Sequence, residues 1–153
     1  MTELQFIEQL KSRLLTESAA SRSLPIPPGD DCALVPATGE GVLFAADMLM
    51  EGVHFDLSLT TPELIGRKAL AVNLSDIAAM AGTPTGVTVC LALPKARGGK
   101  LGEGIMRGMT DLANEFNVAI AGGDTNAWNG SLVVSVAELR FAVCFCKTQI
   151  SCC

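Results

Sequence analysis

Five aspartates in this sequence stand in motifs whose chemistry suits a divalent cation. Asp76 is the most unusual of them, because it lies in the apolar stretch Ala71–Gly82 (AVNLSDIAAMAG), which predicts a helix buried on most sides. An ionised carboxylate in such surroundings is costly unless a cation meets it. Oxygen ligands without a cluster of sulfur or imidazole favour Mg²⁺ or a similar ion, which usually bridges to phosphates. The other four aspartates are Asp30 and Asp31 in GDD, Asp47 in AAD, and Asp124 in GGDT.

Each motif alone also has an ordinary structural interpretation. An aspartate after glycine is most often a turn residue bonded to its own backbone, and Asp76 alone could face solvent. The set is more informative, because Asp31, Asp47 and Asp124 are predicted at strand ends, where α/β proteins gather ligands. The two glycines before Asp124 would let the backbone approach a phosphate closely. The chain lacks a Walker lysine motif and G-x-G-x-x-G, so a nucleotide would be held mainly through metal ions.

The elements that must position these residues follow from the spacing of apolar side chains. A loop over residues 48–55 (MLMEGVHF) carries the only histidine, His54, for which holding a substrate is a more economical role than general base. The order α-β-β-α-β-α-β-β predicts an α/β fold, an α+β sandwich in which one mixed sheet packs against helices. We predict helices over residues 4–15, 62–81 and 101–116, and strands over 32–35, 42–47, 85–93, 118–121 and 132–137.

Composition excludes several classes of partner. With 153 residues, 49% hydrophobic and 18% charged, the chain can form a globular domain with a real core. A net charge of −5 with no basic cluster beyond Arg67-Lys68 argues against nucleic acid. No apolar run approaches the ~18 residues of a membrane span, and the N-terminus does not resemble a signal peptide, so we expect a cytoplasmic protein without a membrane partner. Cys32 and Cys90 are predicted core residues, and the spacing of the four cysteines near the C-terminus does not favour zinc.

As a set, the motifs resemble the thiamine-monophosphate kinase family of the aminoimidazole-ribonucleotide-synthetase-like superfamily. The matching segments are GDDCALV at 29–35, D-x3-EGVHF at 47–55, IGRKALAVNLSDIAAMAGTP at 65–84 and GGDTN at 122–126. GDD and GGDT occur across the superfamily, whereas the two middle segments are much more particular to this kinase. The resemblance covers most of residues 26–137 and implies the fold of the superfamily's N-terminal domain.

The resemblance implies an ATP-binding, Mg²⁺-dependent transferase of thiamine biosynthesis. Such an enzyme moves the γ-phosphoryl group of ATP to thiamine monophosphate, giving thiamine diphosphate, and it is a homodimer whose N-terminal sheets join across a two-fold axis. No general acid or base is assigned, because transfer between two polyanions needs positioning and charge neutralisation more than proton transfer. We carry the family's binding roles over to the matching positions of this sequence. Several Mg²⁺ ions would bind Asp31, the carbonyl of Ala46, Asp47, Asp76 and Asp124. ATP would bind Gly123 and Asp124, and the thiamine phosphate would contact His54.

The sequence departs from the family pattern at two places. The family usually has hydroxyl residues before the aspartate at position 47, where this chain has Ala45-Ala46. The pattern also fades after Ala137, so we expect an N-terminal metal- and ATP-binding domain over 1–137. Residues 138–153 would then be a cysteine-rich tail outside the fold, as after a truncation or frameshift, with the family's second domain absent. Two alternatives stay open: a truncated, non-catalytic Mg-ATP-binding or dimerisation module, and a sibling ATP-dependent enzyme of the same superfamily.

Overall fold

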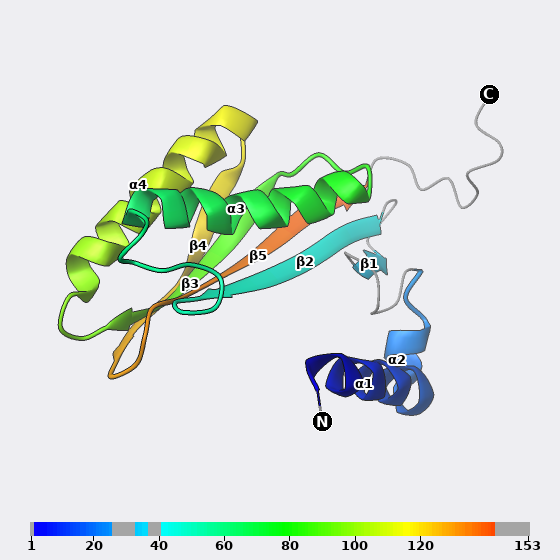
Figure 1. Cartoon of the computed structure of the whole chain (residues 1–153). Helices are drawn as coiled ribbons and strands as arrows, with labels where there is room; N and C mark the ends of the chain where they lie inside the picture. The colour runs from blue at the N-terminus through cyan, green and yellow to red at the C-terminus, as the bar shows by residue number, and fades with distance from the viewer. Residues whose placement is uncertain (1, 26–32, 37–40, 143–153) are drawn as a thin grey trace.

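One mixed five-stranded sheet organises the chain, and its strand order is β1-β2-β5-β3-β4 (Figure 1). The computed structural model describes residues 2–25, 33–36 and 41–142. Helices α3 and α4 cover one face of the sheet (Figure 1), which confirms the predicted α/β class. The strands are β1 (Ala33–Pro36), β2 (Gly41–Met50), β3 (Gly86–Pro94), β4 (Ala119–Trp128) and β5 (Val133–Ala142), and the helices are α1 (Glu3–Glu17), α2 (Ala19–Arg22), α3 (Pro62–Ala79) and α4 (Gly98–Phe116).

Strand β5 lies at the centre of the sheet and fixes the register of its neighbours. It pairs antiparallel with β2 on one side and with β3 on the other. Strands β3 and β4 pair in parallel, as expected for strands joined by a helical crossover such as α4. One row across the sheet therefore runs from Asp47 of β2 through Val136 and Val89 to Gly123 of β4.

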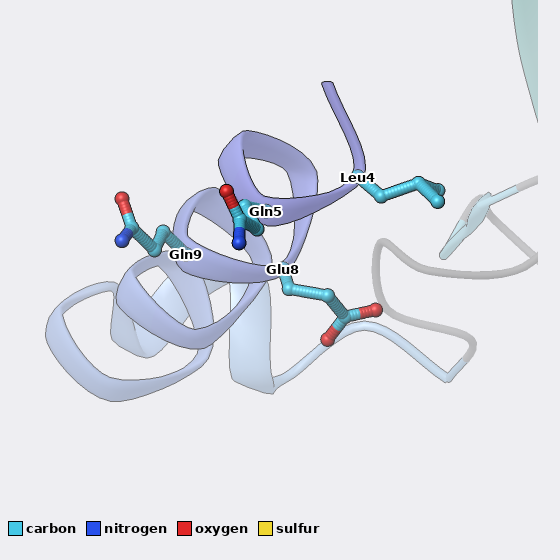
Figure 2. Close-up of a pocket in the computed structure, with 4 residues that line it drawn as sticks. All are labelled: Leu4, Gln5, Glu8 and Gln9. Atoms are coloured by element: carbon cyan, nitrogen blue, oxygen red, sulfur yellow. The ribbon is translucent and has the colours of Figure 1, made fainter. Parts of the chain in front are cut away.

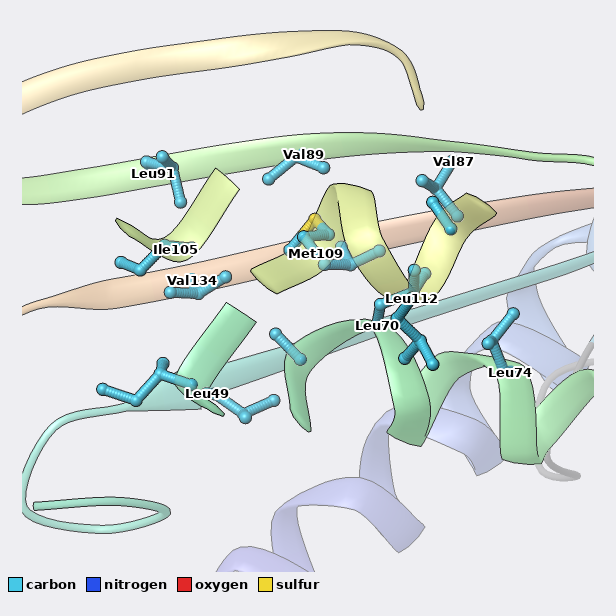
Figure 3. Close-up of a cluster of buried hydrophobic side chains, with 14 of the residues drawn as sticks. Leu49, Leu70, Leu74, Val87, Val89, Leu91, Ile105, Met109, Leu112 and Val134 are labelled. Atoms are coloured by element: carbon cyan, nitrogen blue, oxygen red, sulfur yellow. The ribbon is translucent and has the colours of Figure 1, made fainter. Parts of the chain in front are cut away.

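The core lies between the sheet and the two covering helices (Figure 3). Side chains alternate between this face and the opposite one, so Leu49 is buried while its neighbour Met48 is 54% exposed. Cys90, predicted as a core residue, lies on the open face of β3 and is exposed. That prediction was wrong because helices cover only one face of its strand. The core includes Leu49, Ile65, Leu70, Leu74, Val87, Val89, Leu91, Ile105, Met109, Leu112 and Val134.

Helices α3 and α4 pack closely because glycines stand where they cross. A side chain on Gly108 would collide with the backbone carbonyl of Glu63, and one on Gly66 would collide with that of Ile105. Helix α3 begins at a Thr61 cap, whose hydroxyl accepts a hydrogen bond from the Leu64 amide. Only one face of α3 is buried and Leu64 is exposed, so the prediction of a helix buried on most sides was wrong.

Three strands extend further than their sequences predict. Strand β2 runs to Met50 and β4 to Trp128, so Asp47 and Asp124 lie within strands and not at strand ends. Strand β5 continues to Ala142, five residues beyond the predicted end, because its pairing with β2 continues. Residues 138–142 are thus strand residues, and residues 143–153 lie outside the described part of the chain.

Helix α1 contacts α2 and no other described helix or strand. It begins with a capping box, in which the side chains of Thr2 and Gln5 each accept a hydrogen bond from the other's backbone amide. Its apolar side chains Leu4 and Phe6 are exposed. None of the described helices is both long and apolar enough to cross a membrane.

Candidate metal and phosphate site

Two carboxyl groups, one on α3 and one on β5, interact where the helix packs on the sheet. Asp76 is half-buried on the helix, and Glu138 is fully buried on the helix-covered face of β5. Burial, and to a lesser extent the negative charge of Asp76, raises the pKa of Glu138 to about 7. The rise in pKa shows that an ionised pair is unfavourable here without a compensating positive charge.

Three buried side-chain oxygens on α3 and β5 have no hydrogen-bond partner among the described residues. Asn73 is fully buried on α3, and its amide nitrogen donates to the carbonyl oxygen of Ala69 at 3.0 Å. Its side-chain oxygen and both carboxyl oxygens of Glu138 have no hydrogen-bond partner within the described residues. Buried polar atoms normally find a partner, and carboxylate and amide oxygens are the ligands that a hard cation prefers.

Asp47 lies on the same covered face of the sheet as Glu138. It stands two residues along β2 from Ala45, which is the register partner of Glu138. Its backbone carbonyl accepts a hydrogen bond from the hydroxyl of Ser135 at 3.1 Å. Within the ranges that the structure describes, however, no three of the residue types His, Cys, Asp and Glu gather closely enough to hold a metal ion. The described residues alone therefore do not complete a metal site, and Asp31, the further predicted ligand, lies outside them.

Asp124 lies apart from the acids beneath α3. It is exposed on edge strand β4, where it is the register partner of Cys90 on the open face. The side-chain amide of Asn126 donates a hydrogen bond to its carboxylate at 2.7 Å. Strands β5 and β3 lie between β2 and β4. At the usual strand spacing, the backbones of β2 and β4 are therefore about 14 Å apart. The structure therefore does not bring Asp124 and Asp47 together, because sheet order and side-chain alternation put them on different strands and faces. Ala46 lies beside Asp47, with its side chain toward the open face.

The two glycines before Asp124 have different environments. Both have positive φ, 148° for Gly122 and 154° for Gly123, and the register between β3 and β4 shifts next to them. A side chain on Gly123 would collide with the backbone carbonyl of Val89, whereas a side chain on Gly122 would meet nothing within 4 Å. Gly123 is therefore needed for strand packing, and Gly122 leaves the open surface that a phosphate could approach.

His54 lies in a tight loop after β2, at the end of the sheet where α3 begins. The Met50 amide donates to His54 Nδ1 at 3.0 Å, and the His54 amide donates back to the Met50 carbonyl at 2.9 Å. Lys68 of α3 donates from Nζ to the His54 carbonyl at 2.5 Å. Asp76 follows Lys68 by eight residues on α3, which separates their backbones by about 12 Å.

Several polar residues at the site were not singled out from the sequence. Glu138 was assigned to the tail, although the alternation VVSVAEL over residues 133–139 puts it on the same strand face as Val134 and Val136. Glu51 and Lys68 hold the His54 loop, and no local pattern marks them, because their partners are distant in sequence.

Two regions of the described structure carry surface hollows, and none of the residues above lines them. One is lined by Leu4, Gln5, Glu8 and Gln9 of α1 (Figure 2). The other lies beside Lys95 and Trp128 at the ends of β3 and β4. Neither contains a residue predicted for metal, nucleotide or substrate binding.

Comparison with known proteins assigns the chain to a family. The family described as AIR synthase related protein, N-terminal domain, matches residues 29–139. The chain belongs to this family. It is 39% identical over 140 residues to thiamine-monophosphate kinase of Bacillus subtilis (strain 168), covering 91% of this chain and 42% of that protein. The resemblance found in the motifs is therefore confirmed.

Solved structures agree with this assignment. AaThiL complexed with AMPPCP and TMP superposes with a TM-score of 0.78 at 27% identity, covering 92% of this chain and 42% of that one. Thiamine-monophosphate kinase from Stenotrophomonas maltophilia K279a is 36% identical with a TM-score of 0.62, covering 93% of this chain and 43% of that one. The chain thus spans less than half the length of these relatives.

Proposed function

We propose that this chain is the N-terminal, metal- and ATP-binding part of a thiamine-monophosphate kinase, a transferase of thiamine biosynthesis. The reaction is the Mg²⁺-dependent transfer of the γ-phosphoryl group of ATP to thiamine monophosphate, giving thiamine diphosphate. The identity to the Bacillus subtilis kinase is the observation that carries the proposal, and it favours this activity over those of sibling enzymes. The cytoplasm, where ATP is available, is the compartment that we propose for this reaction.

The proposed metal ligands belong to two groups. Asp47 and Asp76, with Asp31, form the first, and the unpartnered oxygens of Asn73 and Glu138 beneath α3 support a cation there. The second is Asp124, which with Gly123 meets ATP at the edge of β4, beside the open backbone of Gly122. The Ala46 carbonyl is a further metal ligand. Several Mg²⁺ ions, when bound, would screen the repulsion between donor and acceptor phosphates.

We also propose a homodimer formed through the open face of the sheet. Phe44, Met48, Met50 and Leu139 are exposed apolar side chains on this face. Contiguous exposed apolar side chains of this kind are typical of protein–protein contacts. A two-fold axis over the face would cover them with the same surface of a second copy.

The decisive experiment is a product assay with the full chain. Purified protein is incubated with ATP, Mg²⁺ and thiamine monophosphate, and thiamine diphosphate is separated by chromatography, with an EDTA reaction as control. We expect Mg²⁺-dependent product. Mg²⁺-dependent nucleotide binding without product would support the alternative of a non-catalytic module, and the absence of both would refute the proposed site.

A further inference from the structure

The His54 loop fixes which nitrogen of the imidazole carries the proton. Nδ1 accepts a hydrogen bond from the Met50 amide, so in the neutral ring the proton must be on Nε2. No hydrogen bond within the described part of the chain uses Nε2. The side chain is exposed, so this N–H is available to a ligand.

The backbone of the loop is held on both sides of the histidine. The Met50 carbonyl accepts from the amides of Val53 and His54, at 3.1 and 2.9 Å, and the Gly52 amide donates to the Phe55 carbonyl at 2.8 Å. Gly52 has a φ of 83°, which allows the sharp turn. The imidazole therefore projects from a closed ring of hydrogen bonds and not from an open segment.

Two charged residues connect this ring to the rest of the fold. Lys68 donates to the His54 carbonyl, which ties the loop to α3. Glu51 ties it to the residues just before β5 and α4. Its carboxylate accepts hydrogen bonds from the Leu132 amide at 3.0 Å and from Arg97 at 3.1 Å, and its own amide donates to the Leu132 carbonyl at 3.0 Å. The Glu51 side chain is 19% exposed, whereas that of its partner Arg97 is 58% exposed.

We infer that His54 presents a preset Nε2–H donor to an anionic phosphate oxygen, and that Lys68 and Glu51 are its positioning residues. The inference rests on the proposed function, in which His54 contacts the thiamine phosphate. A fixed N–H donor suits an oxyanion, because it needs no reorientation when the ligand arrives. The same proton prevents Nε2 from acting as a base, consistent with a reaction in which a phosphate oxygen is itself the nucleophile.

The protonation of the ring can be measured without any enzymatic activity. His54 is the only histidine, so ¹⁵N-histidine labelling of the full chain gives one pair of ring nitrogens. At pH 8, long-range ¹H–¹⁵N correlation spectra should show a protonated Nε2 and an unprotonated Nδ1. A protonated Nδ1, or averaging between the two tautomers, would overturn the inference whatever the chain does with thiamine monophosphate.

Ligand binding tests the role of the donor. Adding thiamine monophosphate and Mg²⁺ should shift the Nε2 resonance and leave Nδ1 unprotonated. His54→Gln places an amide near the position of Nε2, and His54→Asn places one near Nδ1. We expect the Asn variant to bind thiamine monophosphate about tenfold more weakly than the Gln variant, the scale of one hydrogen bond to a charged group. Equal affinities of the two variants for thiamine monophosphate would overturn the phosphate contact. The expected tautomer with no change of the Nε2 resonance on adding ligand would overturn it as well, and would also count against the proposed substrate site.

Substitutions at Lys68 test positioning. Lys68→Met should average the ring-nitrogen signals and weaken thiamine monophosphate binding about tenfold, and Lys68→Arg, which keeps a donor, should restore most of both. Lys11→Met on α1 is the matched control, and circular dichroism checks that each variant folds. Unchanged nitrogen signals and unchanged affinity in a folded Lys68→Met variant would remove Lys68 from the proposal.

Discussion

Glu138 should make the folded chain less stable as the pH rises. Its side chain is fully buried, and its pKa is raised from 4.5 to about 7, first by burial and then by the charge of Asp76. Below pH 4.5 the carboxyl is protonated in both folded and unfolded chains, so it costs nothing there. Between pH 4.5 and 7 the unfolded chain loses this proton first, so the free energy of unfolding falls with rising pH. Above pH 7 this difference in pKa lowers the free energy of unfolding by about 3 kcal/mol, at about 1.4 kcal/mol per pKa unit.

Glu138→Gln removes this charge and nearly preserves the shape of the side chain. We expect the variant to match the wild type near pH 4 and to exceed it by about 3 kcal/mol near pH 8. Urea unfolding of both proteins at the two pH values gives the free energies, with circular dichroism and the fluorescence of the only tryptophan as probes. EDTA in the buffers keeps divalent cations away from the carboxyl groups.

The difference between variant and wild type at each pH is the informative quantity, because other groups contribute to both proteins equally. Glu103→Gln on the exposed side of α4 is the control, and a surface substitution of this kind should change stability by less than about 0.5 kcal/mol. If the advantage of Glu138→Gln does not grow from pH 4 to pH 8, the carboxyl is hydrated or paired, and the argument from burial is wrong.

Three further outcomes follow from the structure. Gly108→Ala should destabilise the chain by about 2 kcal/mol or more in urea unfolding, because a methyl group would collide with the Glu63 carbonyl, whereas Gly99→Ala, with open space around it, should be neutral or slightly stabilising. Asp76→Asn should weaken Mg²⁺-dependent ATP binding at least about tenfold in calorimetry, and unchanged binding would contradict the metal role proposed for Asp76. Met48→Glu should shift the proposed dimer to monomer in analytical ultracentrifugation, because it puts two charges into an apolar contact; a dimer that persists would exclude the open face.

Local patterns were enough to predict most elements. The spacing of Leu101, Ile105, Met109 and Leu112 predicts α4, and all four side chains are buried in the structure. The cap at Thr61 likewise predicts where α3 begins. These predictions succeed because the periodicity of a helix and its first-turn hydrogen bonds are properties of neighbouring residues.

The site was harder to predict because it depends on long-range pairing. The strand over residues 118–121 was predicted to end before GGDTN, yet edge strand β4 continues through this segment to Trp128, where β3 supplies the partner. The sheet order that separates Asp124 from Asp47 is also a long-range property. Glu138 was misjudged for the same reason, because its burial depends on pairing with β2 and β3 on both sides.

The separation of the acids limits how the proposed kinase site can work. Asp47 and Asp124 lie about 14 Å apart across the sheet, and a Mg²⁺ ion binds its ligands at about 2 Å, so a single ion cannot contact both side chains in this arrangement. The proposed ions must therefore form at least two groups, one beneath α3 and one at the edge of β4. A phosphate chain that reaches both groups would extend past the edge of the sheet, where Gly122 leaves the backbone open. A side chain at Gly122 would strain the backbone at its positive φ but meet no atom, whereas one at Gly123 would also collide with the Val89 carbonyl, so substitutions at Gly123 should cost folding more.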